Sequence, residues 1–122
     1  MAMTAPSAHQ ATARHPNEVD LKRIARALHS RRRYRYVTPS VHAAPGGYRI
    51  DSPCCSRNVD PGGGVIDIAL LEHRADAAPD SGPWCLYARD HVAGAWQFCG
   101  SHRRLADALD LLCTDPERRF WR

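Results

Sequence analysis

The chain has 122 residues, of which 43% are hydrophobic and 25% charged, and its formal net charge is +4. This length predicts one domain, and the composition is that of an ordinary soluble globular protein. No stretch approaches the roughly 18 consecutive apolar residues of a membrane helix, and no N-terminal apolar run suggests a signal peptide. We therefore expect no membrane partner.

The N-terminal residues 1–16 are polar and Ala-rich, which predicts a disordered tail ahead of a single domain at 17–122. The domain should open with an amphipathic helix capped by Asn17. Its apolar residues recur at helical spacing, as Leu21, Ile24, Ala25 and Leu28. The helix should end near His29 to Ser30, because a longer helix would place arginines on the apolar stripe.

Five strand-like segments follow, at 34–42, 48–55, 65–73, 84–91 and 96–99. The connections between neighbouring strands favour hairpins over crossovers. A final helix is expected after an N-cap at Ser101, with one more helical turn carrying Phe120 and Trp121. The expected fold class is α+β, an antiparallel sheet of about five strands in a meander with the N- and C-terminal helices packed on one face.

Alternation of apolar and polar residues also predicts a register. Pairing Val41 with Ile50 and Cys54 with Ile66 separates an apolar sheet face from a polar one. The apolar face would carry Val37, Val41, Tyr48, Ile50, Cys54, Ile66, Ile68 and Leu70. The polar face would carry Tyr36, Thr38, Ser40, His42, Arg49, Asp51, Cys55, Asp67 and Leu71.

Positive charge is concentrated in the first half of the chain. Residues 1–60 hold ten basic and four acidic side chains, and no acid lies between Leu21 and Ile50. This asymmetry favours an acidic partner, nucleic acid first, although a solvated basic face remains the alternative. Arginine binds phosphate and tyrosine stacks on bases. The expected contact residues are Lys22, Arg23, Arg26, Arg31, Arg32, Arg33, Tyr34, Arg35 and Tyr36.

Two other functions stay open. A protein–protein adaptor would use the aromatic pair Phe120–Trp121 or the hairpin that begins at Trp84. A metal-dependent hydrolase or nuclease would use Asp51 and Asp67 as carboxylate ligands. The lysine that such nucleases place two residues after the second acid is absent, and pairing of the two acids with Arg49 or Arg57 across the sheet is the alternative. We therefore expect a binding module rather than an enzyme.

The cysteines predict reduced thiols in a cytoplasmic setting. Their number, five, is odd, and Cys54 and Cys55 are adjacent, which makes a poor disulfide framework. Adjacent cysteines on a strand point to opposite faces and do not match zinc-ligand spacing. We expect no metal and no cofactor, and Cys55, close to Arg57, is the alternative candidate for a reactive thiol.

The segments HPNEVDLKRIARAL (15–28), RRRYRYV (31–37), SPCCSRNVDPGGGVIDIA (52–69), RDHVAGAW (89–96) and TDPERRFW (114–121) resemble a family of small uncharacterised bacterial proteins. Such families are catalogued as domains of unknown function. The resemblance covers residues 15–121 and implies a bacterial cytoplasmic protein. It assigns no activity, ligand or catalytic residue.

Overall fold

The computed structural model describes residues 14–32, 37–53, 64–76 and 81–121. Its elements in chain order are α2 (Glu18–Leu28), β1 (Ser40–Ala44), β2 (Gly47–Pro53), β3 (Val65–His73), β4 (Trp84–Asp90), β5 (Ala95–His102) and α3 (Leu105–Thr114).

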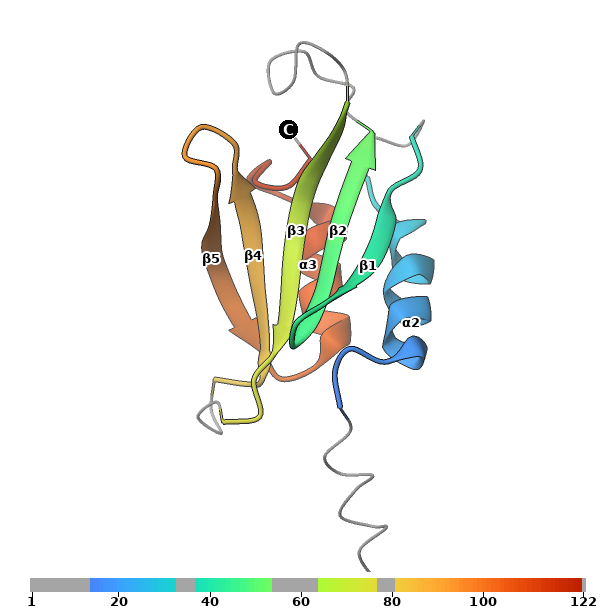
Figure 1. Ribbon diagram of the computed structural model, residues 1–122, viewed down its shortest axis with the longest axis vertical. Helices are drawn as coiled ribbons and strands as arrows, with labels where there is room; N and C mark the ends of the chain where they lie inside the picture. Colours follow the sequence, from blue (N-terminus) through green and yellow to red (C-terminus); the bar gives the residue numbers. More distant parts are fainter. Residues whose placement is uncertain (1–13, 33–36, 54–63, 77–80, 122) are drawn as a thin grey trace, which may run out of the picture.

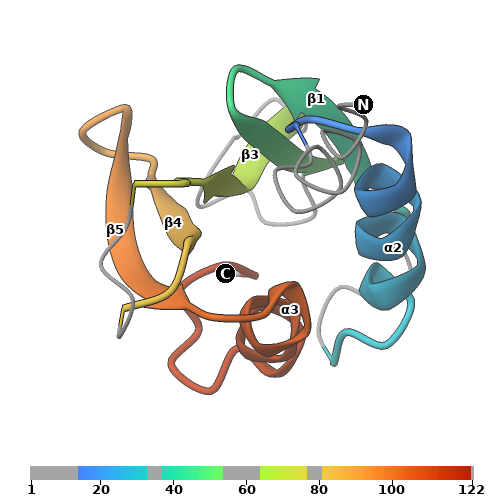
Figure 2. The ribbon, with the colours of Figure 1, turned by 90° about the horizontal axis from the view of Figure 1, so that it is seen from below.

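The five strands form one antiparallel sheet whose spatial order follows the chain. Helix α3 lies behind the middle of the sheet and α2 lies beside β1 (Figure 1). Seen from below, the sheet curves around the two helices, which share its concave side (Figure 2). The predicted α+β meander with both helices on one face is confirmed, and the opposite face of the sheet, here called the open face, is covered by no helix of the described residues.

Helix α2 begins and ends where the sequence predicts. Asn17 lies just before it in an extended conformation, and its side-chain oxygen accepts a 2.8 Å hydrogen bond from the backbone N–H of Asp20. Ile24 and Leu28 are buried against the sheet, and His29 is the C-cap. The apolar spacing thus places the basic side chains of the helix on the side away from the core.

The register of the first hairpin is confirmed, because Val41 pairs with Ile50. The second register is wrong: Ile66 pairs with Ser52, and Cys54 lies outside the described residues. The pairing differs from the prediction by two residues at Ile66, and a β-bulge then reduces the difference to one residue, which reverses the predicted faces. Ile50 pairs with Ala69 but Asp51 pairs with Asp67, which leaves Ile68 as an extra residue in β3.

The bulge exchanges the faces of two leucines. Leu71, predicted on the polar face, has no exposed surface, whereas Leu70, predicted in the core, is half-buried and pairs with Tyr87. Ile68 and Ala69 are both buried although they are consecutive, because the bulge turns both side chains inward. The predicted core positions Ile50 and Ile68 are confirmed.

The start of α3 also differs from the prediction. Ser101 belongs to β5, where it pairs with Cys85, so the N-cap is Arg104 instead. Arg104 makes no capping hydrogen bond, but its side chain binds Asp107 in the first turn at 3.2 Å. Strand pairing therefore extends β5 to His102 and delays the helix.

Residues 115–121 form no helical turn, contrary to prediction. This C-terminal segment folds back so that Phe120 and Trp121 are 2% and 1% exposed. The indole N–H of Trp121 donates a 2.9 Å hydrogen bond to the carbonyl of Leu112. The segment is therefore part of the core.

Candidate nucleic-acid interface

The outward side of α2 presents three basic side chains, Lys22, Arg23 and Arg26, which we call the α2 cationic face. All three residues are exposed, and Lys22 and Arg26 are one turn apart, so they lie in one row. Arg23 also donates a 3.0 Å hydrogen bond to Asp20. Among the described residues, no ion pair engages Lys22, Arg26 or the exposed Arg32 that follows the helix.

A groove of about 470 Å³ runs between α2 and α3, with Arg23 and Arg26 on its α2 side. Its α3 side includes Leu109, Asp110 and Cys113. The thiol of Cys113 donates a 3.3 Å hydrogen bond to the carbonyl of Ala27, which ties the two helices together. Burial raises the pKa of Cys113 to about 11, so this thiol is protonated at neutral pH.

Arg31 does not belong to the exposed basic surface, contrary to prediction. It is 5% exposed, and its guanidinium group donates hydrogen bonds to the carbonyls of Leu28, at 2.7 Å, and Val37. The same group lies 5.6 Å from the centre of the Trp121 ring. Arg31 therefore fixes the chain that leaves α2 against the C-terminal segment. The other predicted contacts, Arg33, Tyr34, Arg35 and Tyr36, lie outside the described residues.

The carboxylates of Asp51 and Asp67 are occupied by an arginine. The two aspartates are direct cross-strand partners, and one guanidinium nitrogen of Arg49 lies 3.1 Å from Asp51 and 2.7 Å from Asp67. His42 adds a contact of 3.0 Å to Asp51. A metal ion at this position would have to displace Arg49. Within the described ranges, no cluster of three or more His, Cys, Asp or Glu side chains is placed to hold a metal ion.

The aromatic contacts expected of an adaptor are inside the protein. Trp84, Phe120 and Trp121 are all buried, so neither the Phe120–Trp121 pair nor Trp84 can form a docking surface. Among the described aromatic residues, Phe98 on β5 is exposed, with 57% of its surface accessible. An adaptor contact through Phe120, Trp121 or Trp84 itself is therefore excluded by burial, whereas a contact through the rest of the β4–β5 hairpin stays a prediction.

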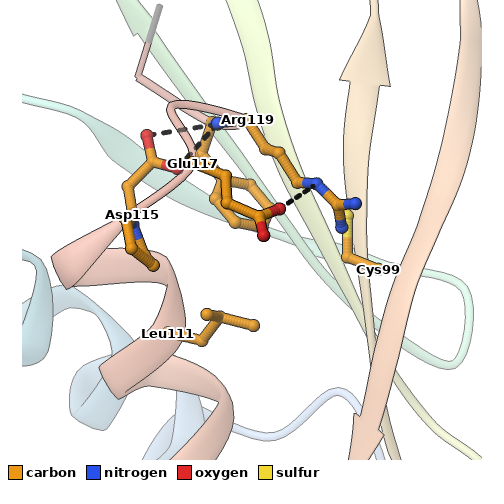
Figure 3. Close-up of a pocket in the computed structure, with 7 residues that line it drawn as sticks. Cys99, Leu111, Asp115, Glu117 and Arg119 are labelled. Atoms are coloured by element: carbon orange, nitrogen blue, oxygen red, sulfur yellow. Dashed lines mark hydrogen bonds and ion pairs between the residues drawn. The ribbon is translucent and has the colours of Figure 1, made fainter.

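A pocket of about 210 Å³ lies between β5, α3 and the C-terminal segment (Figure 3). Glu117 and Arg119 form a 3.1 Å ion pair on its wall, and Cys99 and Leu111 supply apolar surface. The carboxylate of Asp115 points to the backbone of the C-terminal segment, where it accepts the N–H groups of residues 119–121. These bonds are structural, and they leave the pocket without an obvious chemical role.

Comparison with known proteins gives one match, to the family described as "Domain of unknown function (DUF3024)", over residues 12–122. The chain belongs to the DUF3024 family. The sequence resemblance to a domain of unknown function is thereby confirmed. No curated protein and no solved structure matches the chain. No helix among the described residues of this DUF3024 chain is long and apolar enough to cross a membrane.

The structure also brings together a group of titratable and aromatic side chains that sequence reasoning missed. The rings of His15 and His73 stack with their centres 4.2 Å apart, and both lie edge-to-face against Trp84 at 4.9 Å. Nδ1 of His15 is 2.7 Å from the hydroxyl of Tyr48 and 3.6 Å from Asp20. No spacing signal could reveal this cluster, because its members come from the segment before α2 and from four separate elements. His15, assigned to the N-terminal tail from sequence, is thus packed onto the sheet.

Acidification should destabilise the DUF3024 fold through this cluster. Burial lowers the pKa of His15, and the neighbouring His73 lowers it further. Burial also lowers the pKa of His73. The carboxylate of Asp20 opposes both shifts. As the pH falls through the ordinary histidine pKa near 6.5, these two histidines take up protons more readily in the unfolded chain than in the folded one. The free energy of unfolding therefore decreases. The urea concentration at the midpoint of unfolding should therefore decrease when the pH is lowered from about 7.5 to about 5.5.

Replacing His73 by Phe keeps a ring stacked on His15 and removes one titrating group, so it should reduce that loss. His29→Gln is the matched control, because His29 is exposed at the end of α2. If His73→Phe and the native chain lost stability equally on acidification, the cluster would not be the source of the pH dependence.

Proposed function

We propose that this DUF3024 chain is a nucleic-acid-binding domain that holds the phosphate backbone with the α2 cationic face. The observation that carries the proposal is that Lys22 and Arg26 are exposed in one row and are engaged by no acid among the described residues. No acidic residue occurs anywhere between Leu21 and Ile50 to oppose a polyanion. Cations held on a rigid helix contact phosphates without reading base sequence.

The basic segment after the helix extends this surface in the proposal. Arg32 is exposed where the chain leaves α2, and its backbone N–H is bonded to the carbonyl of Cys113. Arg33, Tyr34, Arg35 and Tyr36 follow it directly in the sequence and are proposed as further contacts.

The thiols of Cys85, Cys99 and Cys113 are free, which supports a reducing, cytoplasmic location for the protein.

Salt dependence tests the proposal. Each phosphate that a side chain neutralises releases counterions, so the logarithm of the binding constant should fall linearly with the logarithm of salt concentration. Three or four contacts predict a slope of roughly −2 to −3.6. The measurement is fluorescence anisotropy of a labelled oligonucleotide across a salt series.

The double variant Lys22→Glu/Arg26→Glu should weaken binding about tenfold or more at low salt and make the slope shallower. Arg103→Glu/Arg118→Glu is the matched control, because it makes the same change of charge at two exposed arginines outside α2. No binding at micromolar protein, or equal losses in the two variants, would overturn the proposal and leave a protein partner as the alternative.

A further inference from the structure

The open face of the sheet carries aromatic side chains at its β4–β5 end. The register places Arg49, Leu70, Tyr87 and Phe98 in one row across strands β2 to β5. Phe98 meets Tyr87 edge-to-face, with ring centres 5.6 Å apart and planes at 65°. Because Phe98 is 57% exposed, much of its ring surface is available to a ligand.

A third aromatic residue lies next to this pair. Trp96 pairs with Arg89, two residues from Phe98 and Tyr87 respectively, so both lie on the same face. The guanidinium group of Arg89 sits 5.0 Å from the centre of the Trp96 ring. Two residues of strand span about 7 Å, so Trp96 and Phe98 offer successive rings along β5.

A hollow of about 330 Å³ adjoins Tyr87 and Phe98 on the side opposite Arg89. Its lining combines the two rings with Arg74 and with polar residues Ser81 and Ser101. The side chain of Arg74 is 54% exposed and lies 3.9 Å from Asp76. Arg74 also interacts with the Tyr87 side chain, and this contact raises the pKa of Arg74. The aromatic pair is thus flanked by a guanidinium group on each side.

We propose that this surface, the aromatic platform formed by Tyr87, Trp96, Phe98, Arg74 and Arg89, binds unpaired bases of a single-stranded nucleic acid. A base stacks on the exposed ring of Phe98, and the neighbouring phosphates contact Arg74 and Arg89. Aromatic rings bind bases of any sequence through their faces, and arginine binds phosphate and also stacks on planar groups. This inference rests on the proposed function and names its ligand as single-stranded.

The acids on the open face limit where the strand can lie. Asp51 and Asp67 share Arg49 on β2 and β3, so that part of the face does not attract phosphate. Burial raises the pKa of Tyr87, the nearby acid Glu72 adds to the increase, and Arg74 opposes it, so an acid also lies close to the Tyr87 hydroxyl. The platform therefore accommodates one or two nucleotides on β4 and β5.

A duplex cannot use the platform, because its bases are stacked and paired internally. The test compares oligothymidine of about 12 nucleotides with the same strand in a duplex and with adenosine monophosphate. Phe98→Ala should weaken oligothymidine binding by about fivefold or more and leave duplex binding unchanged. Val92→Ala, which removes another exposed apolar side chain at the β4–β5 turn, is the control and should change neither.

Tryptophan fluorescence supplies a readout that a loss of stability would not imitate. Trp84 and Trp121 are 7% and 1% exposed, so the half-buried Trp96 is the indole that a ligand on the platform can reach. Oligothymidine should quench the native emission, and Trp96→Phe should abolish the quenching while the strand still binds.

The outcomes separate this inference from the proposed function. If Lys22→Glu/Arg26→Glu loses binding while Phe98→Ala binds oligothymidine like the native chain, the platform is overturned and the α2 cationic face stands. If Phe98→Ala weakens binding and the α2 variant does not, the α2 face fails instead. Adenosine monophosphate binding as tightly as the oligonucleotide would overturn the single-strand assignment in favour of a free nucleotide.

Discussion

Asp115→Ala should lower the free energy of unfolding by about 3–5 kcal/mol. The carboxylate is 1% exposed and accepts backbone N–H groups from Arg119 at 2.7 Å and Trp121 at 2.9 Å, with Phe120 at 3.3 Å. Hydrogen bonds to a charged group are stronger than neutral ones, and deleting the acceptor leaves the buried donors of Phe120 and Trp121 without their partner. Urea unfolding followed by tryptophan fluorescence measures the loss.

The comparison variant is Glu117→Ala in the same segment. Glu117 is exposed, and its ion-pair partner within the described part of the chain is the exposed Arg119, so its removal should cost no more than about 0.5 kcal/mol. Asp115→Asn keeps the size of the side chain and one carbonyl acceptor, and should fall between the two. Equal stabilities for Asp115→Ala and Glu117→Ala would show that the carboxylate does not hold the segment in place.

The C-terminal segment illustrates how a local signal can mislead. Asp115-Pro116-Glu117 has the composition of a helix start, which led to the predicted extra turn. In the structure Asp115 does accept hydrogen bonds from backbone N–H groups, but these groups belong to a folded-back segment and not to a helix. The segment buries Phe120 and Trp121. Burial of two large rings outweighs the local preference, and nothing within five residues of Asp115 reveals where those rings will pack.

The candidate site shows the same division between local and long-range information. Lys22 and Arg26 could be placed on an exposed face from helical period alone, because the apolar stripe of α2 fixes the opposite side. The burial of Arg31 could not, since it depends on Trp121, ninety residues away. The open-face platform was also missed, because its rings come from a hairpin in which both faces carry aromatics.

The predicted pairing of β2 with β3 is wrong by two residues at Ile66 and by one residue beyond the bulge at Ile68. Strict alternation through β2 and β3 assigns Leu70 to the core, and no residue in VIDIALLEH marks the bulge at Ile68. With the bulge, Leu71 faces the helices and Leu70 joins Arg49 and Tyr87 on the open face. The extra residue therefore decides which leucine contributes to the core and which extends the aromatic platform.

A matched pair of variants measures this exchange directly. Leu71 has no exposed surface and lies between its cross-strand partners Tyr48 and Leu86, so Leu71→Ala should cost about 3–5 kcal/mol through lost burial and a cavity. Leu70→Ala, on the half-buried open face, should cost about 1–2 kcal/mol. Urea midpoints of the two proteins decide the register, because the unbulged alternation requires the opposite order. Leu70→Ala should in addition weaken oligothymidine binding slightly, because Leu70 supports Tyr87 from the neighbouring strand. Leu71 lies on the other face of the sheet, so Leu71→Ala should affect binding only through its effect on stability.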